Sequence, residues 1–158
     1  MTKWALALII FCIPAVAVDF RVPKVVKALP RTAHKALETE QQCLGSALHH
    51  EASGEPLAGQ RAVYDVITNR AKAAGKSICA VVRSPGQFSW VGSKPMLPYT
   101  QAMKEKISRV KNHTKILDSK FRWFFTTRVQ PKWSNSMDCH TIGNHKFCAI
   151  KESKDGNY

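Results

Sequence analysis

The chain has 158 residues, of which 44% are hydrophobic, enough for one domain with its own core. This composition excludes a chain that is disordered throughout. Lys and Arg number 24 against 11 Asp and Glu, and the formal net charge of +13 favours an anionic partner, which is nucleic acid, a membrane surface or a polyanionic cell envelope.

The N-terminal segment has the pattern of a secretory signal peptide. A short basic start (residues 1–3) precedes an unbroken apolar run (residues 4–13), and Pro14 with Ala15-Val16-Ala17 supplies a helix breaker and an A-x-A site. We expect residues 1–17 to be cleaved and the protein to be exported to the periplasm, the cell wall or the extracellular space. The alternative is an uncleaved, weakly anchored signal, although the run is short for a membrane span of about 20 residues. Export argues against a nucleic-acid partner and limits membrane contact to transient contact through this segment.

The next two segments are an expected leader and an expected helix. Two prolines and scattered basic residues predict an extended leader over residues 18–34. Apolar residues then recur at helical spacing over residues 35–50, which predicts a helix. Gly54 and Pro56 end it, because the residue before a proline is pushed out of helical geometry.

Two more helices are expected further along the chain. The second runs from about Pro56 to Gly75, where the glycine is a suitable C-terminal stop. Residues 76–95 alternate short apolar pieces with turn signals, so we predict loops and brief strands there. The third helix is expected from about Tyr99 to His113, with an inward face of Met103, Ile107 and Val110.

The C-terminal part is aromatic and β-like. From Phe121 onward the pattern predicts a small strand pair, and residues 152–158 are expected to be a frayed tail. Helices therefore dominate over a small β element, and the predicted fold class is α+β, mainly helical. We expect one domain over residues 35–151 and a monomer.

Four cysteines follow the signal segment, an even number that suits an oxidising compartment. They allow three pairings. We favour Cys43 with Cys79 and Cys139 with Cys148, because the second pair closes a short, hairpin-sized loop. The alternative is a zinc site at Cys139-His140 with His145 and Cys148, but its spacing matches no common zinc module, and we expect no metal.

Glu51 continues the apolar stripe of the first helix at the point where that helix ends. Burial disfavours a charged carboxylate, and the negative end of a helix repels it, so both conditions raise the pKa of this group. Glu55 would add like-charge repulsion if it lies nearby. A carboxylic acid that stays protonated near neutral pH is suited to general acid catalysis on a leaving group such as a glycosidic oxygen. The structural alternative is a capping or ion-paired role, with Arg61 or Arg70 as partner.

Three blocks of the sequence resemble the SleB/CwlJ-type cell wall hydrolases. HHEASGEPLAGQRAVYDVITNR carries the acid-A-x-G-E-P segment, then G-Q-x-A-V and an N-R pair. SICAVVRSPGQFSW matches the next block with C-x-V-V and Q-F-S, and Trp133 precedes a closing IGNHKF element. The blocks come in the family's order and span roughly residues 41–150. One departure is Cys148, which follows the last block where members often have tyrosine.

The resemblance implies a lysozyme-like or lytic-transglycosylase-like domain that cuts peptidoglycan between N-acetylmuramic acid and N-acetylglucosamine. The family's catalytic glutamate corresponds to Glu51, which would act alone as acid and then as base, without a metal or organic cofactor. A hydrolytic muramidase is the alternative reaction, and it would recruit Glu55 or Asp65 to activate water. The implied partners are peptidoglycan glycan strands and the anionic envelope surface.

Further candidates for substrate contact each have a structural alternative. An acidic side chain can fix a turn, an amide on a helix is usually solvated, a buried histidine is often structural, and aromatic side chains in a small domain are more often core. The candidates are Glu55, Gln60, Asn69, Gln87, Phe88, Ser89 and His145. The tryptophans Trp90, Trp123 and Trp133 could stack on sugar rings.

Two rival functions stay open. An N-acetylmuramoyl-L-alanine amidase would commonly need zinc. A cationic protein that only binds envelopes would need no turnover, and Glu51 would then be dispensable. A bacteriophage lysin and a bacterial remodelling or germination enzyme both fit the sequence.

Overall fold

The computed structural model describes residues 31–151. The elements in chain order are α1 (Arg31–Ala52), α2 (Leu57–Ala74), α3 (Ile78–Val82), α4 (Gln101–Asn112), β1 (Trp123–Thr126), a 3-10 helix η1 (Lys132–Ser136), β2 (Met137–Ile142) and β3 (His145–Ile150). The fold is helix-rich with one small sheet, which confirms the predicted α+β class. The predicted signal (residues 1–17) and tail (residues 152–158) lie outside the described residues. None of the described helices has the length and apolar character that a membrane span requires.

Three details differ from the expectation. Helix α1 begins at Arg31, so the last four residues of the predicted extended leader are helical; they follow the leader's last proline, and proline restricts only itself and the residue before it. Residues 78–82 form the short helix α3 in a segment predicted as loops and strands. The predicted strand pair is a three-stranded sheet, in which the aromatic segment expected to be β-like supplies β1 (Trp123–Thr126).

Local sequence signals set the helix ends. Gly75 adopts the left-handed conformation (φ 59°) after the last turn of α2, which glycine tolerates without a Cβ penalty. The hydroxyl groups of Ser77 and Thr100 accept hydrogen bonds from Ala80 N at 3.1 Å and Met103 N at 3.2 Å. These side chains cap α3 and α4 and satisfy backbone donors that the helices leave free.

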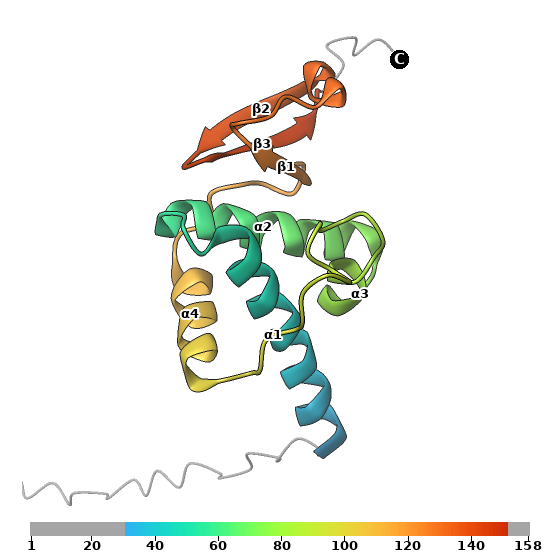
Figure 1. The fold of residues 1–158 in the computed structure, drawn as a ribbon, viewed down its shortest axis with the longest axis vertical. Helices are drawn as coiled ribbons and strands as arrows, with labels where there is room; N and C mark the ends of the chain where they lie inside the picture. Colours follow the sequence, from blue (N-terminus) through green and yellow to red (C-terminus); the bar gives the residue numbers. More distant parts are fainter. Residues whose placement is uncertain (1–30, 152–158) are drawn as a thin grey trace, which may run out of the picture.

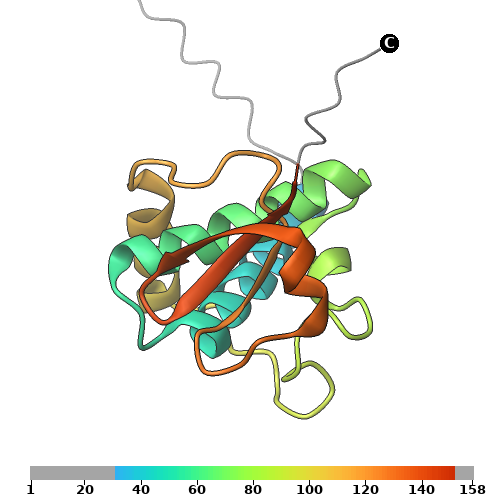
Figure 2. The same cartoon turned by 90° about the horizontal axis from the view of Figure 1, so that it is seen from above.

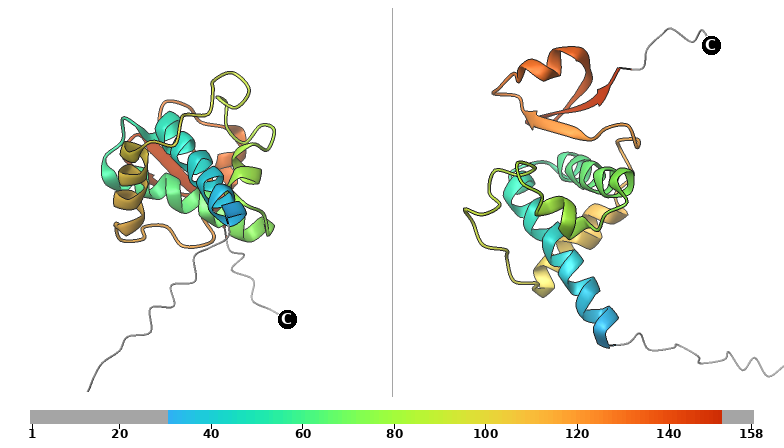
Figure 3. Two further views of the ribbon diagram at one scale, coloured as in Figure 1. Left: turned by 90° about the horizontal axis from the view of Figure 1, so that it is seen from below. Right: turned by 90° about the vertical axis from the view of Figure 1, so that its right-hand side faces the viewer.

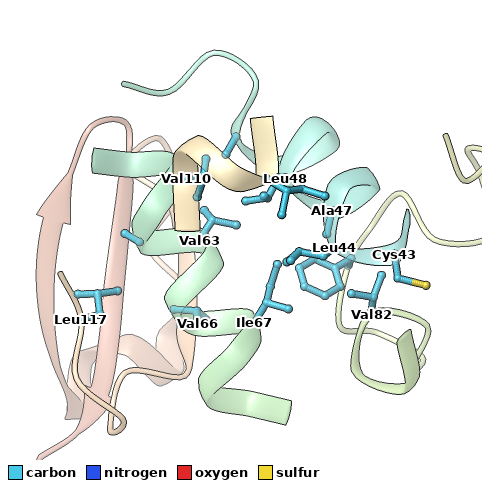
Figure 4. Packing of buried hydrophobic residues seen from close by; sticks show 14 of the residues in the cluster. Cys43, Leu44, Ala47, Leu48, Val63, Val66, Ile67, Val82, Val110 and Leu117 are labelled. Carbon is cyan, nitrogen blue, oxygen red and sulfur yellow. The ribbon is translucent and has the colours of Figure 1, made fainter. Parts of the chain in front are cut away.

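The apolar core lies among the helices (Figure 4). Figure 4 shows Leu44, Ala47 and Leu48 of α1 facing Val63 and Ile67 of α2. The predicted inward residues of α4, which are Met103, Ile107 and Val110, are buried as expected. Helix α2 is therefore held from several sides and gives the molecule a rigid central element.

The sheet forms a layer of its own over α2 (Figures 1 and 3). Its strand order is β1-β3-β2, and both pairings are antiparallel. Seen from above, the strands cross over the helices (Figure 2). The central strand β3 buries Phe147, Cys148 and Ala149, and its register places Cys148 opposite Trp123 of β1 and Cys139 of β2.

Both favoured disulfides are present. Cys43–Cys79 links α1 to α3, and Cys139–Cys148 joins β2 to β3 as directly opposed residues. The second bond takes up both thiols of the alternative zinc site, so that set of ligands is not available. The first bond fixes α3 and hence the start of the loop that leads to residues 86–90.

Candidate active site

Glu51 lies in the last turn of α1 and lines a cavity of about 190 Å³. The other walls come from α2, from the loop after α3 and from strands β1 and β3. The lining residues are Glu51, Arg70, Gln87, Phe88, Ser89, Phe124, Phe125, Thr126 and His145. Segments that are up to 94 positions apart in the sequence therefore meet around one carboxyl group, in a position that a ligand can reach.

The environment favours the neutral form of Glu51. Its half-buried position removes water from the carboxyl group, and this desolvation raises the pKa. The indole N–H of Trp90 and the positive charges of Arg70 and Lys94 act in the opposite direction, but the net shift is upward. The indole nitrogen is itself buried and makes no hydrogen bond of normal geometry within the described residues. Glu51 thus has the raised pKa that a general acid needs, as the sequence predicted.

Four other candidates from the sequence share this cavity with Glu51. Gln87 and Ser89 are exposed, and Phe88 and His145 are buried with a part of each facing the cavity. The Phe88 ring also packs against Trp90 and Phe124, with ring centres 6.3 and 6.4 Å apart. The loop after α3 therefore contributes both polar groups and an aromatic wall.

Glu55 lies outside this cavity and holds two turns together. Its Oε2 accepts a hydrogen bond from Asn144 N at 2.9 Å, and its Oε1 lies 3.2 Å from His145 Nδ1. Its carboxyl group is almost fully buried. The α1–α2 turn is thus fastened to the turn between β2 and β3, and His145 is oriented from behind.

Gln60 and Asn69 also lie outside the described cavities. Gln60 Nε2 donates a hydrogen bond to the backbone oxygen of Glu55 at 2.9 Å. Asn69 Nδ2 donates to the backbone oxygens of Asp118 and Phe121 at 2.6 and 3.0 Å. In this structure both amides hold backbone segments and do not face Glu51.

Asp65 and Arg61 form a buried pair on another side of α2. The Nε of Arg61 donates to Asp65 Oδ1 at 2.9 Å, and Asp65 Oδ2 accepts from the backbone N–H groups of Ile116 and Leu117 at 3.0 and 3.1 Å. Arg61 is therefore not the partner of Glu51. Asp65 is 1% exposed and does not line the Glu51 cavity.

Arg70 is the residue that the sequence interpretation undervalued. Its guanidinium group lies over the rings of Phe88 and Phe124, 5.6 and 5.7 Å from their centres, and its Nε donates to the backbone oxygen of Arg122. Its Nη1 is buried without a hydrogen-bond partner in the described part of the chain. Burial lowers the pKa of Arg70 to about 10, while the charge of Glu51 acts the other way. The N-R pair that ends the first sequence block was the signal for it.

A larger cavity of about 510 Å³ shares Arg70, Gln87 and Phe124 with the Glu51 cavity. Trp123 and Trp133 line it, and the Trp133 side chain is 46% exposed and stands edge-on to Phe125 at 5.4 Å. Aromatic faces beside a polar cavity are typical of carbohydrate sites. The site therefore combines an acid, a guanidinium group and stacking surfaces.

Comparison with known proteins agrees with this description. Residues 54–148 match the model of a family described as Cell Wall Hydrolase, and Glu51 lies three residues before the matched segment. The catalytic domain of the Bacillus cereus SleB protein is similar at 25% identity, with 70% of this chain and 90% of that chain covered and a TM-score of 0.57. The catalytic domain of the germination-specific lytic transglycosylase SleB from Bacillus anthracis shares the fold, at 23% identity, 78% and 99% coverage and a TM-score of 0.59. No curated protein matches the chain.

Proposed function

The chain belongs to the cell wall hydrolase family and is a peptidoglycan-degrading enzyme, and from this premise we propose that it is a lytic transglycosylase in which Glu51 is the single acid and base. In this proposal it cuts the glycan strand between N-acetylmuramic acid and N-acetylglucosamine. The observation that carries the proposal is that Glu51 is the only carboxyl group among the residues that line its cavity.

The neighbouring acids are engaged elsewhere. Glycosidases usually place a second carboxylate across the scissile bond, as nucleophile or as the base that activates water. Glu55 is bound to Asn144 and lies against His145, and Asp65 is bound to Arg61 and to backbone N–H groups. Neither lines the cavity. This arrangement supports transglycosylation over a hydrolysis that would recruit one of them.

The reaction needs two proton transfers at Glu51, in which the carboxyl group gives up one proton and then takes up a different one. The protonated carboxyl group donates to the β-1,4 glycosidic oxygen while the bond to the muramic C1 breaks and positive charge develops on that sugar. The resulting carboxylate takes the proton from the 6-hydroxyl group of the same sugar, whose oxygen bonds to C1. A 1,6-anhydro sugar forms, and Glu51 is protonated again, so no water is consumed.

The surrounding side chains are placed where they can assist the proposed reaction at Glu51. Arg70 and the Trp90 indole N–H lower the pKa of Glu51, which stabilises the carboxylate after the first proton transfer. Phe88 and Phe124 line the cavity and exclude water from the reacting centre. Gln87 and Ser89 are the exposed polar groups that suit the acetamido substituents of the sugars.

We also propose that the protein is exported through residues 1–17, because peptidoglycan lies outside the cytoplasm. The amidase alternative gains no support from the side chains present, since no group of three His, Cys, Asp or Glu within the described chain is placed to hold a metal. The envelope-binding alternative does not account for an acid with a raised pKa inside a cavity.

The test is mass spectrometry of the soluble fragments that the protein and its Glu51→Gln variant release from purified peptidoglycan. We expect anhydro-muramic products from the native protein and a loss of about 10²–10⁴-fold in rate from the variant, because general acid catalysis typically contributes this much. Fragments heavier by one water would keep Glu51 as the acid but replace the reaction by hydrolysis.

A matched control removes a carboxylate elsewhere. Glu105→Gln changes an exposed group on α4 and should leave the rate and the products as they are. Lysis by Glu51→Gln at the native rate would refute the proposed role of this residue and favour envelope binding without turnover.

A further inference from the structure

Three cavities meet at one pair of residues. Arg70 and Gln87 line the Glu51 cavity, the tryptophan-lined cavity of about 510 Å³ and a third cavity of about 320 Å³. The third cavity lies between the C-terminal half of α2, α3 and the start of β1. The site is therefore branched, with the acid on one arm and Arg70 and Gln87 at the junction.

The third arm has a strongly positive lining. Its basic residues are Arg70, Lys76 and Arg122, and no aspartate or glutamate lines it. Ser84 and Gln87 add neutral polar groups. A cleft lined by charge of one sign concentrates counter-ions, so this arm attracts anions.

Two nitrogens in this region, Arg70 Nη1 and Arg122 Nε, are buried without a hydrogen-bond partner among residues 31–151. Buried polar groups are nearly always satisfied, and exceptions call for an absent partner such as a ligand. The Arg122 guanidinium group also lies over the Trp123 ring at 5.4 Å from its centre, which limits its movement. Both arginines are thus held in place while N–H groups of their guanidinium groups stay available to a ligand, as in sites that bind carboxylates.

We propose that this basic arm binds the carboxylates of the peptide branch that muramic acid carries, so that the enzyme prefers peptide-bearing strands to bare glycan. This inference rests on the proposed function. The branch leaves the muramic sugar next to the scissile bond, as the basic arm leaves the Glu51 cavity at Arg70 and Gln87. The tryptophan-lined arm is left for the continuing glycan strand, since it offers aromatic faces and Arg70 as its only charged group.

The test compares two substrates from one preparation, after removal of covalently attached anionic polymers. One is intact, peptide-bearing glycan strands, and the other is the same strands after an amidase has removed the peptides. We expect the native protein to cleave the peptide-bearing strands with at least about tenfold higher kcat/KM, because charge-assisted hydrogen bonds add this much in affinity or more. In the Lys76→Gln/Arg122→Gln variant, the ratio of kcat/KM for peptide-bearing strands to kcat/KM for bare strands should fall to about two or less.

A matched variant controls for the loss of two charges. Lys111→Gln/Lys115→Gln removes two exposed lysines, one on α4 and one in the segment after it, and should keep the native ratio. Equal cleavage of both substrates by the native protein would overturn this inference and leave the proposed function intact. A preference that the Lys76→Gln/Arg122→Gln variant retains would also overturn it. If the native protein cleaved neither of the two substrates, the proposed function and this inference would both be overturned.

Discussion

The charge state of Glu51 is set by opposing contributions that can be changed one at a time. Burial raises its pKa, while Arg70 and Lys94 lower it. In the proposed mechanism Glu51 acts in its protonated form, so activity should fall as the pH rises through the pKa of this group. The alkaline limb of the kcat/KM profile therefore reports on Glu51.

Arg70→Gln removes a positive charge that favours the Glu51 carboxylate. The neutral form then persists to higher pH, so we expect the alkaline limb to move upward, in addition to a loss of rate. Lys94→Gln should shift it in the same direction by less, because Lys94 is the smaller of the two contributions and is exposed to solvent. A pH-rate profile of each variant measures this, and a limb that stays in place or moves down would contradict the assignment.

The sequence pointed to Glu51 because a helical stripe is visible from a few neighbouring residues, and these residues place an acid on the apolar face. Arg70 was named only as a possible ion-pair partner. Its surroundings are Phe88, Phe124 and Arg122, which come from segments 18 to 54 positions away. No local pattern shows that such residues meet, so the importance of this guanidinium group emerges only from the fold.

At the scale of elements, a short contact between two turns helps to join the helical layer to the sheet. Glu55, in the turn between α1 and α2, accepts the Asn144 N–H in the turn between β2 and β3. Gly143 precedes that N–H, has a φ of 61°, and leaves no room for a Cβ beside the Glu55 carboxyl group. The glycine is thus required both by its own conformation and by the close approach.

Gly143→Ala should destabilise the protein by about 2–4 kcal/mol, because it adds backbone strain and displaces a buried charged acceptor from its donor. Urea unfolding followed by circular dichroism measures the free energy. Gly86→Ala is the matched control, since Gly86 also has a positive φ but open space around it, and should cost about 1–2 kcal/mol. Equal losses for the two variants would show that the Glu55 contact contributes nothing.

The elements that sequence patterns predicted were the long ones. The limits of α2 and α4 agree to within two residues with the predicted ranges, from about Pro56 to Gly75 and from about Tyr99 to His113. Helix α3 has five residues, too few for a periodic pattern to distinguish it from a loop. Yet the segment after α3 and the strand β1 supply most of the cavity walls, so the site was harder to predict than the fold.

For the molecule as a whole, the net charge of +13 predicts that binding to the wall depends more strongly on salt than catalysis does. Attraction between exposed charges depends on ionic strength, since the Debye length falls from about 10 Å at 0.1 M to about 3 Å at 1 M. The proton transfers that we propose at Glu51 would take place inside a cavity, where screening by salt is much weaker. Binding to intact walls and cleavage of short soluble strands should therefore respond differently to salt.

We expect the fraction of the Glu51→Gln variant that sediments with purified walls to fall several-fold between about 0.05 M and 0.5 M NaCl. Over the same range the native protein should keep its kcat on short strands within about twofold, since screening acts mainly on exposed charges. The variant and the native protein are purified in the same way, and beads without anionic groups control for non-specific adsorption. If kcat fell in parallel with binding, exposed charges would contribute to the step at Glu51, which would contradict the weak screening expected inside the cavity.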